Sequence, residues 1–130
     1  MKIAQILTLL SLFMLTWLAC KKKPMAGLGG KASLTIQCQH HGQNIDSATA
    51  YIKYNSLEAV SLSEYNNAIV LSKNNNNIYT AQFNGLKPGD YYLFAQGWDP
   101  SIANNVKGGI PFSIKEEDTF SLIIPVTEVH

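Results

Sequence analysis

Three histidines and two cysteines are the side chains of this 130-residue sequence best suited to metal ligation or nucleophilic chemistry. His40 and His41 are adjacent, Cys38 precedes them by two positions, and His130 is the last residue. Zinc sites usually take their ligands from pairs spaced several residues apart, which this set does not match. Neighbouring residues of a strand or turn point in different directions. We therefore expect no metal site and no cofactor, and we place His40 and His41 at a solvent-exposed hairpin tip.

The carboxylates give no catalytic constellation either. The run Glu116-Glu117-Asp118 lacks the alternating oxygen ligands and glycine turn of a calcium loop, so we interpret it as a solvated loop between strands. Asp99 stands before Pro100 and is typical of a turn initiator. No facing pair of acids, Gly-x-Ser-x-Gly elbow or Ser/His/Asp set can be nominated. We predict no catalytic residue and no enzyme activity; a hydrolase with an unrecognised site is a third alternative.

The N-terminus has the organisation of an export signal. Lys2 gives a positive start, and residues 3–18 follow without a charge. This apolar run is too short for a comfortable membrane span, which needs roughly 20 residues. A charged start, an apolar centre and a small residue before the cut are typical of a secretory signal. The small residue is Ala19, and the thiol of Cys20 comes directly after it.

The segment Thr16-Trp17-Leu18-Ala19-Cys20 resembles the lipobox of bacterial lipoproteins. It departs from that pattern at Trp17 and Leu18, where the family prefers a leucine and a small residue. The resemblance implies cleavage after Ala19 and acylation of Cys20, palmitate being the kind of chain expected. Each buried CH₂ of such a chain adds about 0.8 kcal/mol of membrane affinity. An ordinary cleaved signal and an uncleaved anchor are the alternatives.

Three lysines, Lys21 to Lys23, come directly after the cysteine. Beside an acyl anchor they would lie among anionic headgroups, each contributing about 1 kcal/mol; a solvated tether is the alternative. In Gram-negative lipoproteins an Asp directly after the cysteine retains the protein in the inner membrane. By that resemblance Lys21 favours the outer membrane, and we expect a lipid-anchored protein of the cell envelope.

After the signal, the length and charge of the remaining chain restrict the number of domains and the kinds of ligand it can bind. We divide the chain into a signal peptide (1–19), a lipidated cysteine with a flexible tether (20–31) and one domain (32–130). Counted from Lys31, the remaining chain has six lysines and nine acids, a net charge of 6 − 9 = −3, and no arginine. This balance argues against nucleic-acid binding. With Cys20 acylated, Cys38 has no partner for a disulfide, and its place in an alternating strand predicts a buried thiol.

The domain has the pattern of β-structure, because apolar and polar residues alternate in short runs separated by turn residues. This pattern predicts an all-β, antiparallel two-sheet sandwich of about seven strands. The expected strands are 32–39, 47–55, 68–71, 78–83, 91–98, 110–114 and 119–126, and residues 58–65 are either a loop or a short strand.

One turn is more specific than the rest. In Leu86-Lys87-Pro88-Gly89-Asp90-Tyr91, proline and glycine supply the turn and Tyr91 can bond back across it, as in a tyrosine corner. The stretch 79–95 around this turn resembles the centre of transthyretin-like (prealbumin) or carboxypeptidase-regulatory-like domains. The resemblance implies their β-sandwich over 32–126, and it departs in 55–73 and in 98–109. It does not imply one function, since such sandwiches serve many roles.

Aromatic residues give the functional lead. Alternation puts Tyr91 on one face of its strand and Tyr92, Phe94 and Trp98 on the other, where they are candidates for ligand binding. Alternatively, Tyr92 and Phe94 cover a second small core beneath a long 98–109 loop. We expect a non-catalytic structural or protein-interaction module with an envelope protein as its partner. The alternative is a small-ligand or carbohydrate-binding module, with a glycan bound around Trp98.

Overall fold

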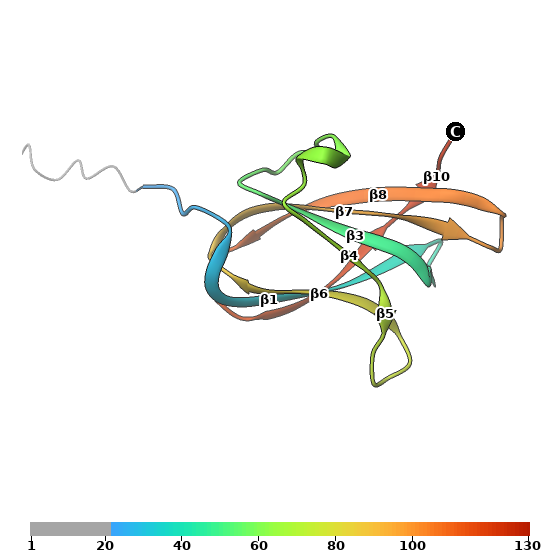
Figure 1. The fold of residues 1–130 in the computed structure, drawn as a ribbon, viewed down its shortest axis with the longest axis horizontal. Coiled ribbons are helices and arrows are strands. Elements are labelled where there is room, and N and C mark those ends of the chain that lie inside the picture. The colour runs from blue at the N-terminus through green and yellow to red at the C-terminus, as the bar shows by residue number, and fades with distance from the viewer. Residues whose placement is uncertain (1–21) are drawn as a thin grey trace, which may run out of the picture.

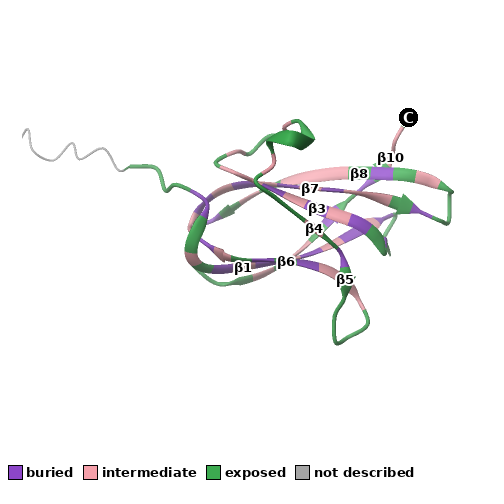
Figure 2. Cartoon of the chain, viewed as in Figure 1, coloured by how far each residue is buried: buried purple, intermediate pink, exposed green. Residues whose placement is uncertain are grey.

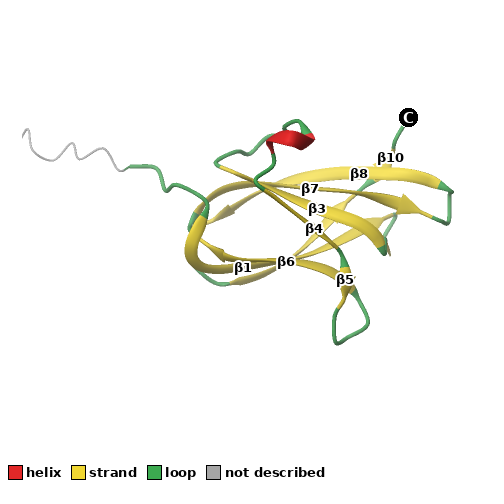
Figure 3. Cartoon of the chain, viewed as in Figure 1, coloured by secondary structure: helices red, strands yellow, loops and turns green. Residues whose placement is uncertain are grey.

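The computed structural model describes residues 22–130, which form two five-stranded β-sheets packed face to face (Figure 1). All strand pairs are antiparallel except β1 with β9, which is parallel. The predicted all-β class with two sheets is confirmed, and strands account for most of the described chain (Figure 3). The strands are β1 Leu28–His40, β2 Gln43–Asn44, β3 Ser47–Tyr54, β4 Asn67–Val70, β5 Ser72–Lys73, β6 Tyr79–Leu86, β7 Gly89–Asp99, β8 Asn104–Ile114, β9 Thr119–Pro125 and β10 Thr127–Glu128.

The chain passes between the two sheets at several points. In the first sheet β1 lies between β6 and β9, with β5 beyond β6 and the short β2 paired to the end of β1. The second sheet has the order β10-β8-β7-β3-β4. Successive short strands β4 and β5 therefore belong to different sheets, as do β9 and β10. The chain segments between these strands connect the two sheets at their edges.

The core lies between the sheets and is supplied by alternate residues of the long strands (Figure 2). On β1 the buried positions are every second residue from Ala32 to His40, as a strand with one face on the core requires. Leu34, Ile52 and Leu93 are fully buried. Each such side chain contributes roughly 1.5–3 kcal/mol on burial. Cys38 belongs to this core, as predicted, with 1% of its surface exposed.

The tyrosine corner is present. The hydroxyl of Tyr91 donates to the carbonyl oxygen of Lys87 at 2.6 Å and accepts from the backbone N–H of Gly27 at 3.0 Å. Tyr91 is fully buried. The sequence did not predict the second bond, which fastens the segment before β1 to the corner.

The predicted flexible tether is therefore shorter than residues 20–31. Ala26 is buried, its N–H donates to the Asn55 side chain at 2.8 Å, and β1 begins at Leu28. Gly89 permits this docking, because a side chain there would place its Cβ 2.6 Å from the Ala26 nitrogen. Of the predicted tether, the part from Ala26 onward belongs to the domain.

One connection differs from its prediction, whereas residues 58–65 lie in a loop, one of the two structures predicted for them. The segment 98–109 is mostly strand, because β7 and β8 extend to a tight turn at residues 100–103, where Ala103 adopts a left-handed φ of 49°. The segment 55–66 is the longer connection, and it carries a short 3₁₀ helix, Leu62–Glu64. Within residues 22–130 no helix has the length and apolar character needed to cross a membrane.

Candidate functional site

The predicted cleavage site Ala19 and lipidation site Cys20 lie outside the described residues. The described chain begins at Lys22, next to the predicted anchor. Lys23 forms an ion pair with Asp90 at 2.8 Å, at the start of β7. The Lys23 ammonium and then the Ser113 hydroxyl lower the pKa of Asp90. One of the three basic residues thus contacts the domain.

Trp98 lines an open groove of about 560 Å³ on the outer face of the second sheet. Strand register places Ser47, Trp98 and Asn105 in one row across β3, β7 and β8, and Thr49, Gln96 and Lys107 in a second row. The rest of the lining comes from Ala48, Val70, Gly97, Val106 and Val129. Trp98 is 44% exposed, so its ring is available to a ligand. The groove offers one large aromatic surface beside hydroxyl, amide and ammonium groups.

The structure does not bring Tyr92 and Phe94 to this groove. Both are half-buried on the same outer face. The Phe94 ring stacks on Tyr65 with centroids 5.7 Å apart and also meets Tyr51 at 5.8 Å. A small aromatic cluster thus forms beneath the 55–66 connection, not beneath the 98–109 segment as the alternative interpretation expected. Of the three candidate ligand-binding residues, only Trp98 lines the groove.

A second constellation lies around His40, and the sequence did not predict it. His40 is 3% exposed rather than at a solvent-exposed tip, and its Nδ1 lies 2.7 Å from Oδ2 of Asp99, which is 4% exposed. The other Asp99 oxygen accepts from the backbone N–H and the hydroxyl of Ser101. Hydrogen bonds from Ser101 and then from His40 lower the pKa of Asp99. Asp99 does initiate the turn, as predicted, but it also holds a buried histidine.

The two histidine rings lie together instead of pointing apart. His40 and Gln43 pair, so His41 and Gly42 form a two-residue hairpin turn with φ of 49° and 76°. Positive φ at both central positions is typical of a type I′ turn. This turn brings the ring centroids of His40 and His41 to 4.1 Å, although the His41 side chain is 79% exposed.

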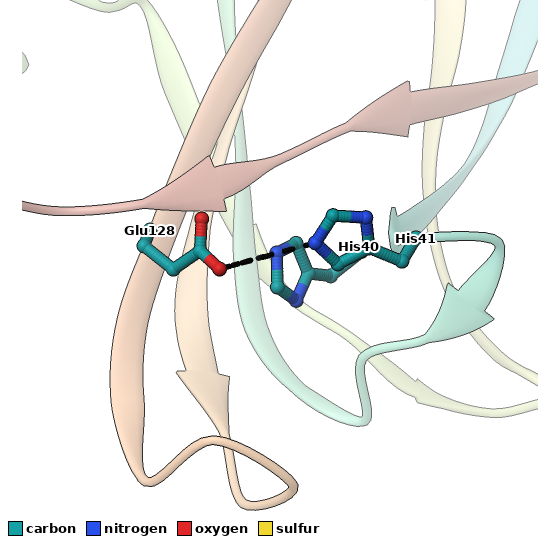
Figure 4. Close-up of side chains that lie close together, drawn as sticks. All are labelled: His40, His41 and Glu128. Atoms are coloured by element: carbon teal, nitrogen blue, oxygen red, sulfur yellow. Dashed lines mark ion pairs between the residues drawn. The ribbon is translucent and has the colours of Figure 1, made fainter.

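Glu128 of β10 completes the constellation (Figure 4). Its Oε1 lies 3.5 Å from Nε2 of His40 and 3.9 Å from Nε2 of His41. A hydrogen bond from its own backbone, then electrostatic interactions with His40, His41 and His130, lower the pKa of Glu128. Nε2 of His40 has no hydrogen-bond partner within the described residues, although it is buried. One ligand atom from each of the three side chains lies within 4.8 Å of the others.

Cys38 takes no part in this constellation. It lies two positions before His40 on the same face of β1. Burial raises the pKa of its thiol to about 11. Because the thiolate is the reactive form, the raised pKa makes Cys38 a poor nucleophile and fits the predicted structural role.

In the comparison with known proteins, no family model matches the chain, and no curated protein matches it.

Proposed function

We propose that this chain is a lipid-anchored protein of the cell envelope whose sandwich is a non-catalytic structural or protein-interaction module. In this proposal the leader is cleaved after Ala19 and Cys20 is acylated. Lys21, at the position where an aspartate would retain the protein in the inner membrane, favours the outer membrane of a Gram-negative bacterium. The sandwich follows the transthyretin-like plan that the tyrosine-corner sequence resembles.

The observation that carries the proposal is the docking of Ala26 on the domain. Only residues 21–25 then separate Cys20 from folded structure, at most about 20 Å of extended chain. A lipid on Cys20 would hold the sandwich close to the bilayer by the end where β1 begins. The groove is lined by residues 96–98 of β7, at the other end of this strand from Gly89, which contacts Ala26.

Anchoring is tested by following the chain in cells given labelled palmitate, with and without the signal-peptidase inhibitor globomycin. We expect label on the protein, a mature N-terminus at Cys20 by mass spectrometry, and accumulation of the precursor with globomycin. Cys20→Ser should lose the label and leave the membrane fraction. Cys38→Ala, which changes the other cysteine, should keep both. A mature chain with unmodified Cys20 that washes from membranes would refute the anchor.

Partner binding is tested by placing a photo-crosslinking amino acid at Asn105, in the groove. The same amino acid at Ser121, which is exposed on β9 of the other sheet, is the control. A discrete adduct from Asn105 and none from Ser121 would support a protein partner at the groove. Equal patterns from both positions would contradict it.

The exposure of Trp98 favours a second candidate function, binding of a small ligand or carbohydrate in the groove. An aromatic plane beside amides and hydroxyls suits a sugar, because its apolar face stacks on the ring and its hydroxyls meet the polar groups. Titration of the chain with a panel of glycans should shift tryptophan fluorescence, and Trp98→Ala should abolish binding measured by calorimetry. If calorimetry detects no binding of any glycan, this second function is refuted and the protein-interaction role is retained.

A further inference from the structure

We propose that His40, His41 and Glu128 bind a divalent transition-metal ion, with Asp99 as the residue that orients His40. The ligand atoms are Nε2 of both histidines and Oε1 of the glutamate (Figure 4). Two imidazoles and one carboxylate favour zinc or a neighbouring metal over calcium or magnesium, which prefer oxygen alone. The site does not depend on the lipid anchor, and its ligands do not line the groove.

Asp99 fixes which nitrogen of His40 faces the site. Its carboxylate is 2.7 Å from Nδ1 and is acceptor-only when ionised, so Nδ1 carries the proton. In the neutral ring Nε2 then presents a lone pair. Metal-bound histidines commonly show this arrangement, with the other ring nitrogen donating to a carboxylate that holds the tautomer and the ring orientation.

The surroundings of Nε2 of His40 favour a bound cation. This atom is buried and has no hydrogen-bond partner within residues 22–130, and it lies 3.5 Å from the Glu128 carboxylate. A lone pair facing a carboxylate oxygen is unfavourable unless a proton or a metal ion lies between them. A proton would serve only His40 and Glu128. A metal ion would also use the His41 nitrogen, which lies 3.9 Å from the same oxygen.

The distances suit a metal ion after a small adjustment. Ligand atoms about 2.0–2.1 Å from a tetrahedral zinc ion are about 3.4 Å from one another. The separations of the two Nε2 atoms from Oε1, 3.5 and 3.9 Å, are close to this value, and the whole set lies within 4.8 Å. His41 is largely exposed and can move by the remaining distance, whereas His40 is held in place by Asp99. The three side chains leave a fourth position for water or a ligand.

The backbone at His41 determines where its ring lies. Its φ of 49° belongs to the left-handed region, in which Asn, Asp and His are the residues most often found after glycine, and Asn and Gly are favoured in this turn. The turn brings the His41 ring beside that of His40. Asn at this position would retain the turn and remove the imidazole, which makes His41→Asn a variant that tests the site without disturbing the fold.

The test uses the full-length chain, purified in detergent without a polyhistidine tag, with Zn²⁺ titrated by calorimetry and Co²⁺ followed by its visible absorption. We expect one equivalent of each metal to bind. The Co²⁺ spectrum should be typical of four-coordinate ligation by nitrogen and oxygen. An excess of Mg²⁺ or Ca²⁺ should not displace either ion. Zn²⁺ should raise the thermal midpoint of the chain.

Four variants separate the outcomes. His41→Asn and Glu128→Gln should lose stoichiometric binding, and Asp99→Asn should weaken it by about 10- to 100-fold, as loss of an orienting carboxylate does. Glu116→Gln, an exposed acid in the loop between β8 and β9, is the matched control and should bind as the parent does. The proposal is overturned if the parent chain binds no metal. It is equally overturned if His41→Asn and Glu128→Gln bind unchanged.

Discussion

Replacing Tyr91 by phenylalanine should release the N-terminal segment from the domain at a measurable cost in stability. The substitution keeps the buried ring and removes only the hydroxyl, which bonds to Lys87 and Gly27. Each hydrogen bond contributes about 1 kcal/mol, and leaving buried partners unpaired adds to the loss. We therefore expect the free energy of unfolding to fall by about 2–3 kcal/mol. For a domain of this size that lowers the thermal midpoint by roughly 10 °C.

The assay is urea unfolding followed by circular dichroism, combined with limited proteolysis. Tyr79→Phe is the control, since the Tyr79 hydroxyl has no hydrogen bond within the described chain and its ring is only half-buried. The Tyr91 variant should also be cut earlier between Lys23 and Lys31, because the Gly27 N–H loses its acceptor. A loss below about 0.5 kcal/mol, or one equal to that of Tyr79→Phe, would refute the idea that the corner holds this segment.

Three further results are expected. Gly89→Ala should destabilise the domain by more than about 1 kcal/mol in urea unfolding, because its Cβ would lie 2.6 Å from the Ala26 nitrogen and φ is +151°; a smaller loss would contradict the close docking of Ala26. Cys38 should react slowly with iodoacetamide in the folded chain and quickly in denaturant, because burial raises its pKa to about 11; fast labelling of the native chain would contradict this. Asp90 has a lowered pKa, so its contribution to stability is present above its unfolded pKa of about 3.9 and is lost as pH falls through the folded value. Asp90→Asn should remove that part of the acid dependence in unfolding midpoints measured across pH, and an unchanged profile would show that the Lys23 and Ser113 contacts contribute nothing.

The strands were predictable because period-two alternation reports burial directly. The row Leu34, Ile36 and Cys38 faces the core as expected. The residues at which the strands begin and end were not predictable in the same way. The glycines before Lys31 suggested a tether, yet Gly30 lies so close to β6 that a Cβ there would meet the Leu86 oxygen at 2.1 Å. Glycine in this place permits close approach of two strands, and composition alone does not distinguish that use from flexibility.

The histidine constellation was present in the same alternation. The β1 row continues from Cys38 to His40, the β7 row that holds Ala95 continues to Asp99, and the row at the end of the chain continues from Val126 to Glu128. Each of these three core-facing rows thus ends in a titratable residue. The sequence could not show that these ends meet, because that depends on the sheet order and on β10 pairing with β8. Nor does spacing reveal the left-handed turn at His41.

If the proposed lipid anchor and metal site are both present, the two ends of the sandwich have different roles. β1 runs from Leu28, beside the segment that leads to Cys20, to His40, and its 13 residues span roughly 40 Å. Glu128 is the last residue of β10, and Val129 of the groove is its neighbour in the chain. If a lipid holds the first end at the bilayer, both the histidine cluster and Trp98 face away from it. A metal ion bound by Glu128 would then restrain the same chain segment that forms one wall of the groove, so that the two sites would be coupled through β10.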